Sequence, residues 1–183
     1  MLCLAPLLFL HACASEKPAA SKEPPVVLEN PKYKYRITFP PGWSLHVHDS
    51  IYLRDLARQA GGTYHADGIY TTKKRWATET VVWPKTGYNS FERVYSDNLK
   101  NAIKSFGPLE GTVSKEESYS RDGNEHREVI YETRGGNQPW ARHKTTFIDR
   151  PGYVLIIHSS CVIRDFDAAK EDFDSIADSL EFF

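Results

Sequence analysis

The sequence predicts a single domain of the α+β class, an α/β/α sandwich with a central and mainly antiparallel sheet. Several short segments in which apolar and polar residues alternate predict strands. Two longer segments with apolar residues three and four positions apart predict helices that cover the sheet. The chain has 183 residues, of which 13% are aromatic, and this length suffices for one core without help from a metal or disulfide bonds.

Alternation of apolar and polar residues is clearest in segment 32–39, where aromatic and aliphatic side chains alternate with basic residues and Thr38. A Pro-Pro-Gly turn then leads to a second alternating segment, 43–47. Further strands are expected at 76–83, 112–120, 125–133, 140–149 and 153–162, with a hairpin turn at Asp122-Gly123. The last of these strands is apolar on both faces, so we expect it in the centre of the sheet.

Two segments, 90–106 and 166–180, carry regular apolar stripes that predict amphipathic helices. Segment 49–60 also has helical spacing and ends at Gly61-Gly62, which would stop a helix. Residues 61–75 read as a loop with some extended structure. Helices combined with mainly antiparallel strands favour a layered α+β domain.

The N-terminal segment differs in composition from the rest of the chain. Residues 2–10 form an apolar stretch of signal-peptide length, too short for a membrane-spanning helix. It ends in Leu10-His11-Ala12-Cys13, which resembles the lipobox of bacterial lipoproteins, where cleavage precedes a cysteine that carries lipid. Residues 14–31, rich in Pro, Ala, Ser, Glu and Lys, are typical of a solvated tether. We therefore expect a signal peptide (1–12), a lipidated Cys13 with its tether (13–31) and one globular domain (32–183).

The lipobox resemblance implies a protein anchored in a bacterial cell envelope by lipid and facing the periplasm. Ala14 follows the cysteine, where an Asp would retain such proteins at the inner membrane in enteric bacteria, so we expect the outer membrane. If Cys3 leaves with the signal and Cys13 takes lipid, only Cys161 remains and no internal disulfide can form. Cys161 follows an apolar run and is expected to be buried.

Two motifs near the ends of the domain resemble those of a known family. Residues 35–43, YRITFPPGW, form a strand that runs into a Pro-Gly-Trp turn, and residues 173–182, FDSIADSLEF, form a helix that leads into a short strand. With the helix 90–106 between them, they resemble the PsbP family and its DcrB-like bacterial relatives. The resemblance implies a central antiparallel sheet between helices and a non-enzymatic role in binding or stabilising other proteins. It implies no shared catalytic residues.

The residues themselves supply no complete catalytic motif. Lys85-Thr86-Gly87 and Ser96-Asp97-Asn98 match two β-lactamase triplets, but their order is reversed and the chain has no Ser-x-x-Lys. Lys and Arg number 23 against 24 Asp and Glu, a balance that gives no reason to expect nucleic acid as a partner. We expect a protein that is not an enzyme and needs no cofactor.

Aromatic and basic residues gather between positions 61 and 88. Aromatic residues are enriched at protein interfaces, so a possible partner surface consists of Tyr64, Tyr70, Lys73, Lys74, Arg75 and Trp76. The basic residues of this set, together with those at 32, 34 and 36, could instead meet anionic lipid or protect a sheet edge from pairing. The aromatic residues could equally belong to the core.

His46 and His48 occupy alternate positions of a predicted strand and therefore share one face, which makes them candidate metal ligands. A third ligand could come from His65, His143 or His158, although nothing in the sequence brings any of them close. Two functions follow as hypotheses. The first is an envelope lipoprotein that binds or stabilises another envelope protein through segment 49–88 and the adjacent sheet. The alternative is a small-ligand or metal carrier that uses His46, His48 and nearby aromatic residues.

Overall fold

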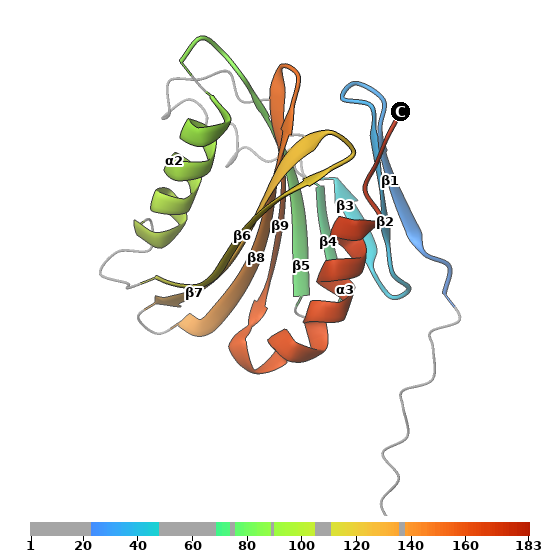
Figure 1. The fold of residues 1–183 in the computed structure, drawn as a ribbon. Coiled ribbons are helices and arrows are strands. Elements are labelled where there is room, and N and C mark those ends of the chain that lie inside the picture. Colours follow the sequence, from blue (N-terminus) through green and yellow to red (C-terminus); the bar gives the residue numbers. More distant parts are fainter. Residues whose placement is uncertain (1–22, 48–68, 74–75, 89, 105–110, 136–137) are drawn as a thin grey trace, which may run out of the picture.

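The computed structural model describes residues 23–47, 69–73, 76–88, 90–104, 111–135 and 138–183. The predicted signal peptide, Cys13 and the predicted helix 49–60 lie outside these ranges. Within them, two helices lie on opposite sides of a large twisted sheet (Figure 1). No helix in the described ranges is both long and apolar enough to cross a membrane.

The described elements follow the predicted order closely. The strands are β1 (Val26–Asn30), β2 (Tyr35–Phe39), β3 (Ser44–Val47), β4 (Ile69–Lys73), β5 (Trp76–Pro84), β6 (Thr112–Arg121), β7 (Asn124–Gly135), β8 (Gln138–Arg150), β9 (Tyr153–Val162) and β10 (Glu181–Phe182). The helices are α2 (Phe91–Lys104), the short 3-10 turn η1 (Ile163–Asp165) and α3 (Phe166–Asp178).

The large sheet has seven strands in the order β3-β4-β5-β9-β8-β7-β6, and all neighbours are antiparallel. Strand β9 lies in its centre, as its apolar residues on both faces predict. The β6–β7 hairpin turns at Asp122-Gly123, where both residues have positive φ (51° and 74°), the conformation that a type I′ turn requires. The predicted α+β sandwich is thus confirmed.

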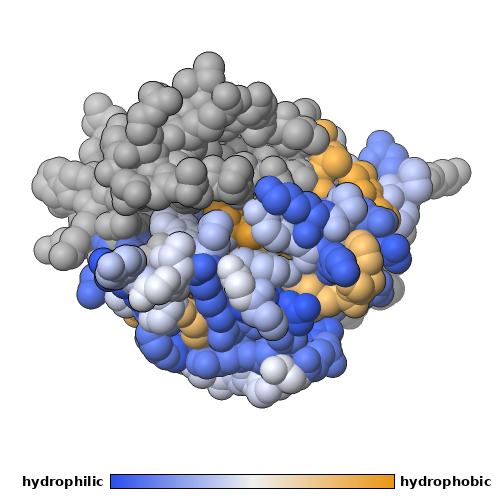
Figure 2. Space-filling view, turned by 90° about the horizontal axis from the view of Figure 1, so that it is seen from above, coloured by the Kyte–Doolittle hydropathy of each residue, from blue (hydrophilic) through white to orange (hydrophobic). Residues whose placement is uncertain are grey.

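A smaller sheet, β1-β2-β10, lies beside the large one. Its first strand corrects a prediction, because β1 falls within the stretch 13–31 that the composition indicated as tether. Leu28 and Asn30 are buried against β2 while Val27 and Glu29 are exposed, so this short stretch does alternate. Seen from above, the described surface is mostly hydrophilic, with hydrophobic patches on the side of β1, β2 and the C-terminus (Figure 2). Val27 and Phe183, both exposed, belong to these elements.

The face of the large sheet that carries α3 holds the larger core. Phe173 lies at its centre, fully buried, with edge-on or tilted ring contacts to Trp43, Trp76 and Phe166. The indole of Trp43 also donates a hydrogen bond of 2.9 Å to Asp172 of α3. The Pro-Gly-Trp turn and the final helix, which carry the family resemblance in the sequence, are therefore in direct contact.

The opposite face of the sheet packs against α2. Phe91, Val94 and Tyr95 of the helix are buried against a cluster that includes Phe147 and Val129. Ser90 caps the helix, since its hydroxyl accepts a hydrogen bond from the amide of Arg93. The predicted amphipathic stripe thus faces the sheet, and each helix covers one face.

Candidate functional site

The predicted partner surface falls only partly within the described residues. Tyr64, Lys74 and Arg75 lie outside them, and only the backbone of Tyr70 and Lys73, on β4, is described. Trp76 begins β5, where it is half-buried and packs on Phe173 with the ring centroids 6.4 Å apart. Its indole therefore contributes to the core beneath α3. For the other members the partner surface stays a prediction.

The predicted metal ligands are not tested either. His48 lies outside the described residues, and for His46 only the backbone position on β3, opposite Tyr70, is described. Among the described side chains, no three His, Cys, Asp or Glu residues form a group that could hold a metal ion. The structure does, however, bring together two of the histidines that the sequence could not place.

His143 on β8 and His158 on β9 form a polar cluster on the α2 face of the sheet. Nδ1 of His143 and Nε2 of His158 lie 3.3 Å apart. The other two ring nitrogens are each 2.8 Å from a hydroxyl, Thr133 for His143 and Thr145 for His158. Tyr131 stacks on the ring of His143 at a centroid distance of 4.7 Å. All four ring nitrogens are therefore engaged by side chains of neighbouring strands.

Burial keeps both rings neutral. It lowers the pKa of His143 to about 3, with a further contribution from His158, and lowers the pKa of His158 to about 4. A neutral imidazole offers one lone pair to a metal, but here that lone pair is already used within the hydrogen-bonded chain of hydroxyls and rings. In this arrangement the cluster satisfies its own polar groups within the sheet.

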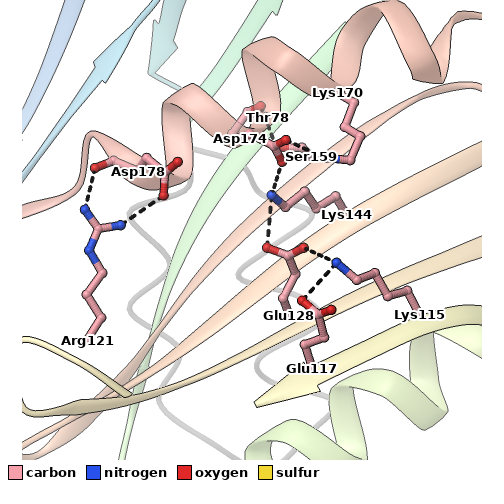
Figure 3. A network of polar contacts seen from close by, with 10 residues as sticks. All are labelled: Thr78, Lys115, Glu117, Arg121, Glu128, Lys144, Ser159, Lys170, Asp174 and Asp178. Carbon is pink, nitrogen blue, oxygen red and sulfur yellow. Dashed lines mark hydrogen bonds and ion pairs between the residues drawn. The ribbon is translucent and has the colours of Figure 1, made fainter. Parts of the chain in front are cut away.

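A second polar network lies on the α3 face (Figure 3). The ammonium group of Lys144 on β8 is buried between Asp174 of α3 and Glu128 of β7, with an Nζ to Oε2 distance of 3.0 Å to Glu128. Lys170 of α3 contacts the other oxygen of Asp174, and Lys115 of β6 lies 4.0 Å from Glu128. Burial opposes the charged form, but hydrogen bonds to the two carboxylates outweigh it and raise the pKa of Lys144. This network joins α3 to the sheet.

Two further candidates do not form sites. The thiol of Cys161 is buried in the α3-face core, and burial raises its pKa to about 11, so it carries little of the thiolate form that a nucleophile needs. A hollow between the β6–β7 turn and the end of α3 is lined by residues that include Arg121, His126 and Phe182. Its volume of about 10 Å³ holds no more than a water molecule.

The large sheet has two edge strands in the described part of the chain, β3 and β6, and β6 is the longer. Nine of the ten residues of this strand are exposed, and only Arg121 is half-buried. One side of β6 pairs with β7, whereas its outer side pairs with no strand in the described part of the chain. An unpaired edge presents backbone N–H and C=O groups that can hydrogen-bond an added strand. The candidate site is therefore the outer edge of β6, residues 112–121.

Solved structures from distant organisms share this architecture. The cyanobacterial PsbP protein (CyanoP) of Synechocystis sp. PCC 6803 is 15% identical, with a TM-score of 0.63 over 95% of this chain and 99% of that chain. The fold is PsbP-like. LpqN, involved in cell envelope biogenesis of Mycobacterium tuberculosis, is 11% identical with a TM-score of 0.56 over 86% of this chain and 89% of its own. The Saccharomyces cerevisiae Ran-binding protein Mog1p is 5% identical with a TM-score of 0.55, over 87% and 96%.

No family model matches the chain, and comparison with curated proteins gives no match. The likeness is therefore one of three-dimensional structure, and at these identities it establishes the PsbP-like fold alone.

The candidate site at the β6 edge differs from the partner surface that was predicted from the sequence. The strand at 112–121 was predicted, but its position at the edge was not, because strand order depends on long-range pairing. One signal was present: the segment TVSKEESYSR has polar residues on both faces, which is typical of a strand exposed on both faces. That pattern could have indicated an edge strand.

Proposed function

We propose that this chain is a lipid-anchored protein of a bacterial envelope that binds another protein chain by adding a strand to β6. The open edge of β6 carries the proposal. Nine of its ten residues are exposed, and strand addition uses an exposed sheet edge, where backbone hydrogen bonds supply affinity and alternate side chains supply specificity. The role is non-enzymatic and needs no cofactor or nucleic acid.

Other features of the structure support a binding role. His143 and His158 bond each other, Lys144 is ion-paired within the domain, and Cys161 is buried. Mog1p is a Ran-binding protein and LpqN is involved in cell envelope biogenesis, so proteins with this fold include one with a binding role and one with a role in forming a cell envelope. The partner surface predicted from the sequence, residues 64, 70 and 73–76, includes positions on β4 and β5, towards the opposite edge of the sheet.

Site-specific photo-crosslinking tests the β6 edge. A photoreactive phenylalanine analogue replaces Ser118, which is exposed in the middle of β6, and a matched variant carries the analogue at Ser175, which is exposed on α3. Both full-length variants are irradiated in the membranes of a bacterial host. We expect a protein adduct from position 118 and none from position 175. An adduct from position 175 alone, or none from 118, would overturn the proposal.

The anchor is tested separately by intact-mass analysis of the protein purified from membranes, with Cys13→Ala as control. The lipobox resemblance predicts a chain that starts at Cys13 and carries two or three acyl groups, and no such mass in the control. An unlipidated chain that retains residues 1–12 would contradict the anchor and leave the β6 proposal standing. Enrichment in the outer-membrane fraction tests the expected location.

A further inference from the structure

The charges of β6 determine which strand can pair with it. Lys115 and Glu117 lie on the same face of the strand, 2.9 Å apart, and more than two fifths of each side chain is exposed. A lysine in the middle of an edge strand discourages pairing with another strand. The register shift between Val113 and Lys115 also interrupts the regular ladder at that end. An acid opposite Lys115 and a base opposite Glu117 in the added strand would offset this effect.

A second copy of β6 can supply both charges. In a two-fold symmetric dimer the same strand pairs antiparallel with itself, so that one residue lies opposite its own copy. If that residue is Glu116, Lys115 of each chain lies opposite Glu117 of the other, and two complementary pairs form about the axis. Lys115 borders the register shift, and Glu116 and Glu117 lie beyond it in the regular part of the ladder. Opposite charges directly across a strand pair are stabilising.

We propose that the strand added to β6 is β6 of a second copy of this chain, paired antiparallel about Glu116. This inference rests on the proposed function, since it names the occupant of the same edge. It joins the two large sheets into one continuous sheet and leaves α2 and α3 on their own faces.

Glu116, which would lie opposite its own copy, has a hydrogen-bond partner within its own domain. The carboxylate of Glu116 accepts a hydrogen bond of 2.5 Å from the hydroxyl of Tyr95 on α2. That bond draws Glu116 towards its own helix on the α2 face, whereas Lys115 and Glu117 lie on the other face with Glu128. Lipid anchors would keep the copies in one membrane, where the effective concentration favours a weak pairing.

Charge reversal tests the register. The K115E variant carries acids at both positions and the E117K variant carries bases at both, so each alone opposes its own copy. Mixed in equal amounts, the two variants again place opposite charges across the strands. Sedimentation velocity of the full chain in detergent should show a dimer for the native sequence. The dissociation constant of the dimer should rise about tenfold or more in each variant alone. Dimers should return in the mixture.

A native chain that stays monomeric at all concentrations would overturn the inference, and so would a mixture that associates no better than its components. Thermal unfolding of each variant verifies that the domain is folded. The outcome is separable from that of the photo-crosslinking: an adduct at position 118 with a different protein, without self-association, overturns the second copy and leaves the proposed function.

A disulfide provides an independent readout. Residues directly opposite in an antiparallel pair have Cα atoms about 4.5–5.5 Å apart, within the span of a disulfide. Glu116→Cys, in a chain with Cys3 and Cys13 replaced by Ala, should form a covalent dimer under mild oxidation. Ser120→Cys is the matched control, exposed on the same strand, because its two copies would lie about 26 Å apart in this register. Equal dimer yields from both variants would contradict the register.

Discussion

His143 and His158 use all four of their ring nitrogens inside the domain. Each ring contacts the other ring through one nitrogen and a threonine hydroxyl through its second nitrogen. The pair therefore joins β7, β8 and β9. From the sequence, both histidines were possible third ligands for a metal at His46 and His48, but nothing showed that they are neighbours of each other. In the register of β8 and β9, Thr145 lies opposite His158 and Ser160 lies opposite His143. This register brings the two rings together, where they stabilise the sheet.

The histidine pair predicts acid sensitivity. Burial lowers the pKa values of His143 and His158 to about 3 and 4, below their ordinary value of 6.5. Below pH 6.5 the unfolded chain therefore binds protons that the folded chain does not, so the free energy of unfolding falls as pH falls, by about 2 kcal/mol for each histidine at pH 5. Denaturant unfolding between pH 7 and 4.5 measures this slope.

The double variant His143→Gln plus His158→Gln serves as the control for this prediction, because it should lose the share of the pH dependence due to these two rings even if it is less stable at pH 7. His126, whose pKa is also lowered by burial, keeps its own share in both proteins. Asp174 does not confound the window. Although burial works in the opposite direction, hydrogen bonds from Lys144 and Lys170 lower its pKa below the ordinary 3.8, so its contribution is lost only at lower pH. An unchanged slope in the double variant would refute the assignment.

Lys144 makes the second prediction at this scale. Its buried ammonium group separates the carboxylates of Glu128 and Asp174, so Lys144→Met should leave two acids without their shared cation and reduce the free energy of unfolding by about 3 kcal/mol. Lys170→Met is the matched control, because that side chain contacts the same aspartate from a largely exposed position and should cost less than about 1 kcal/mol. Equal losses in the two variants would show that burial of Lys144 is irrelevant.

At the scale of elements, α3 attaches the final segment of the chain to both sheets. Ser179, which follows the helix, bonds both the amide and the carbonyl of Thr38 on β2, and Arg121 at the end of β6 contacts Asp178. Apolar periodicity predicted this helix from Phe166 onwards, because α3 buries a regular stripe of apolar side chains. The same reasoning missed β1, since a five-residue strand within a Pro-rich stretch is too short for alternation to outweigh composition.

Phe173 provides the test for this packing. It is fully buried among three aromatic rings, so Phe173→Ala should lower the free energy of unfolding by about 4 kcal/mol. Phe183→Ala removes the same side chain from a position that is 56% exposed and should change stability by less than about 1 kcal/mol. The two variants can be compared by urea unfolding monitored by tryptophan fluorescence. A Phe173 variant no less stable than the Phe183 variant would contradict the role of this ring.

For the whole molecule, the sequence predicted the class and most elements, because hydrophobic periodicity is local. The order of strands depends on contacts between distant segments, so the edge position of β6 required the structure. The same holds for the polar networks: alternation places His143 and Lys144 on opposite faces of a strand, but nothing local shows that α3 covers the face of Lys144 and α2 that of His143. The open edge and the two closed networks together make binding at β6 the best-supported function.

Hydrogen–deuterium exchange of the full chain tests binding at β6 most directly, by comparing protein in the membranes of its bacterial host with dilute purified protein in detergent. If a strand is added to β6, the outward-facing amides of residues 115–121 should exchange more slowly in membranes, while β8 and β9, already paired on both sides, change little. Equal exchange of residues 115–121 in the two samples, or protection gained only elsewhere, would contradict the account.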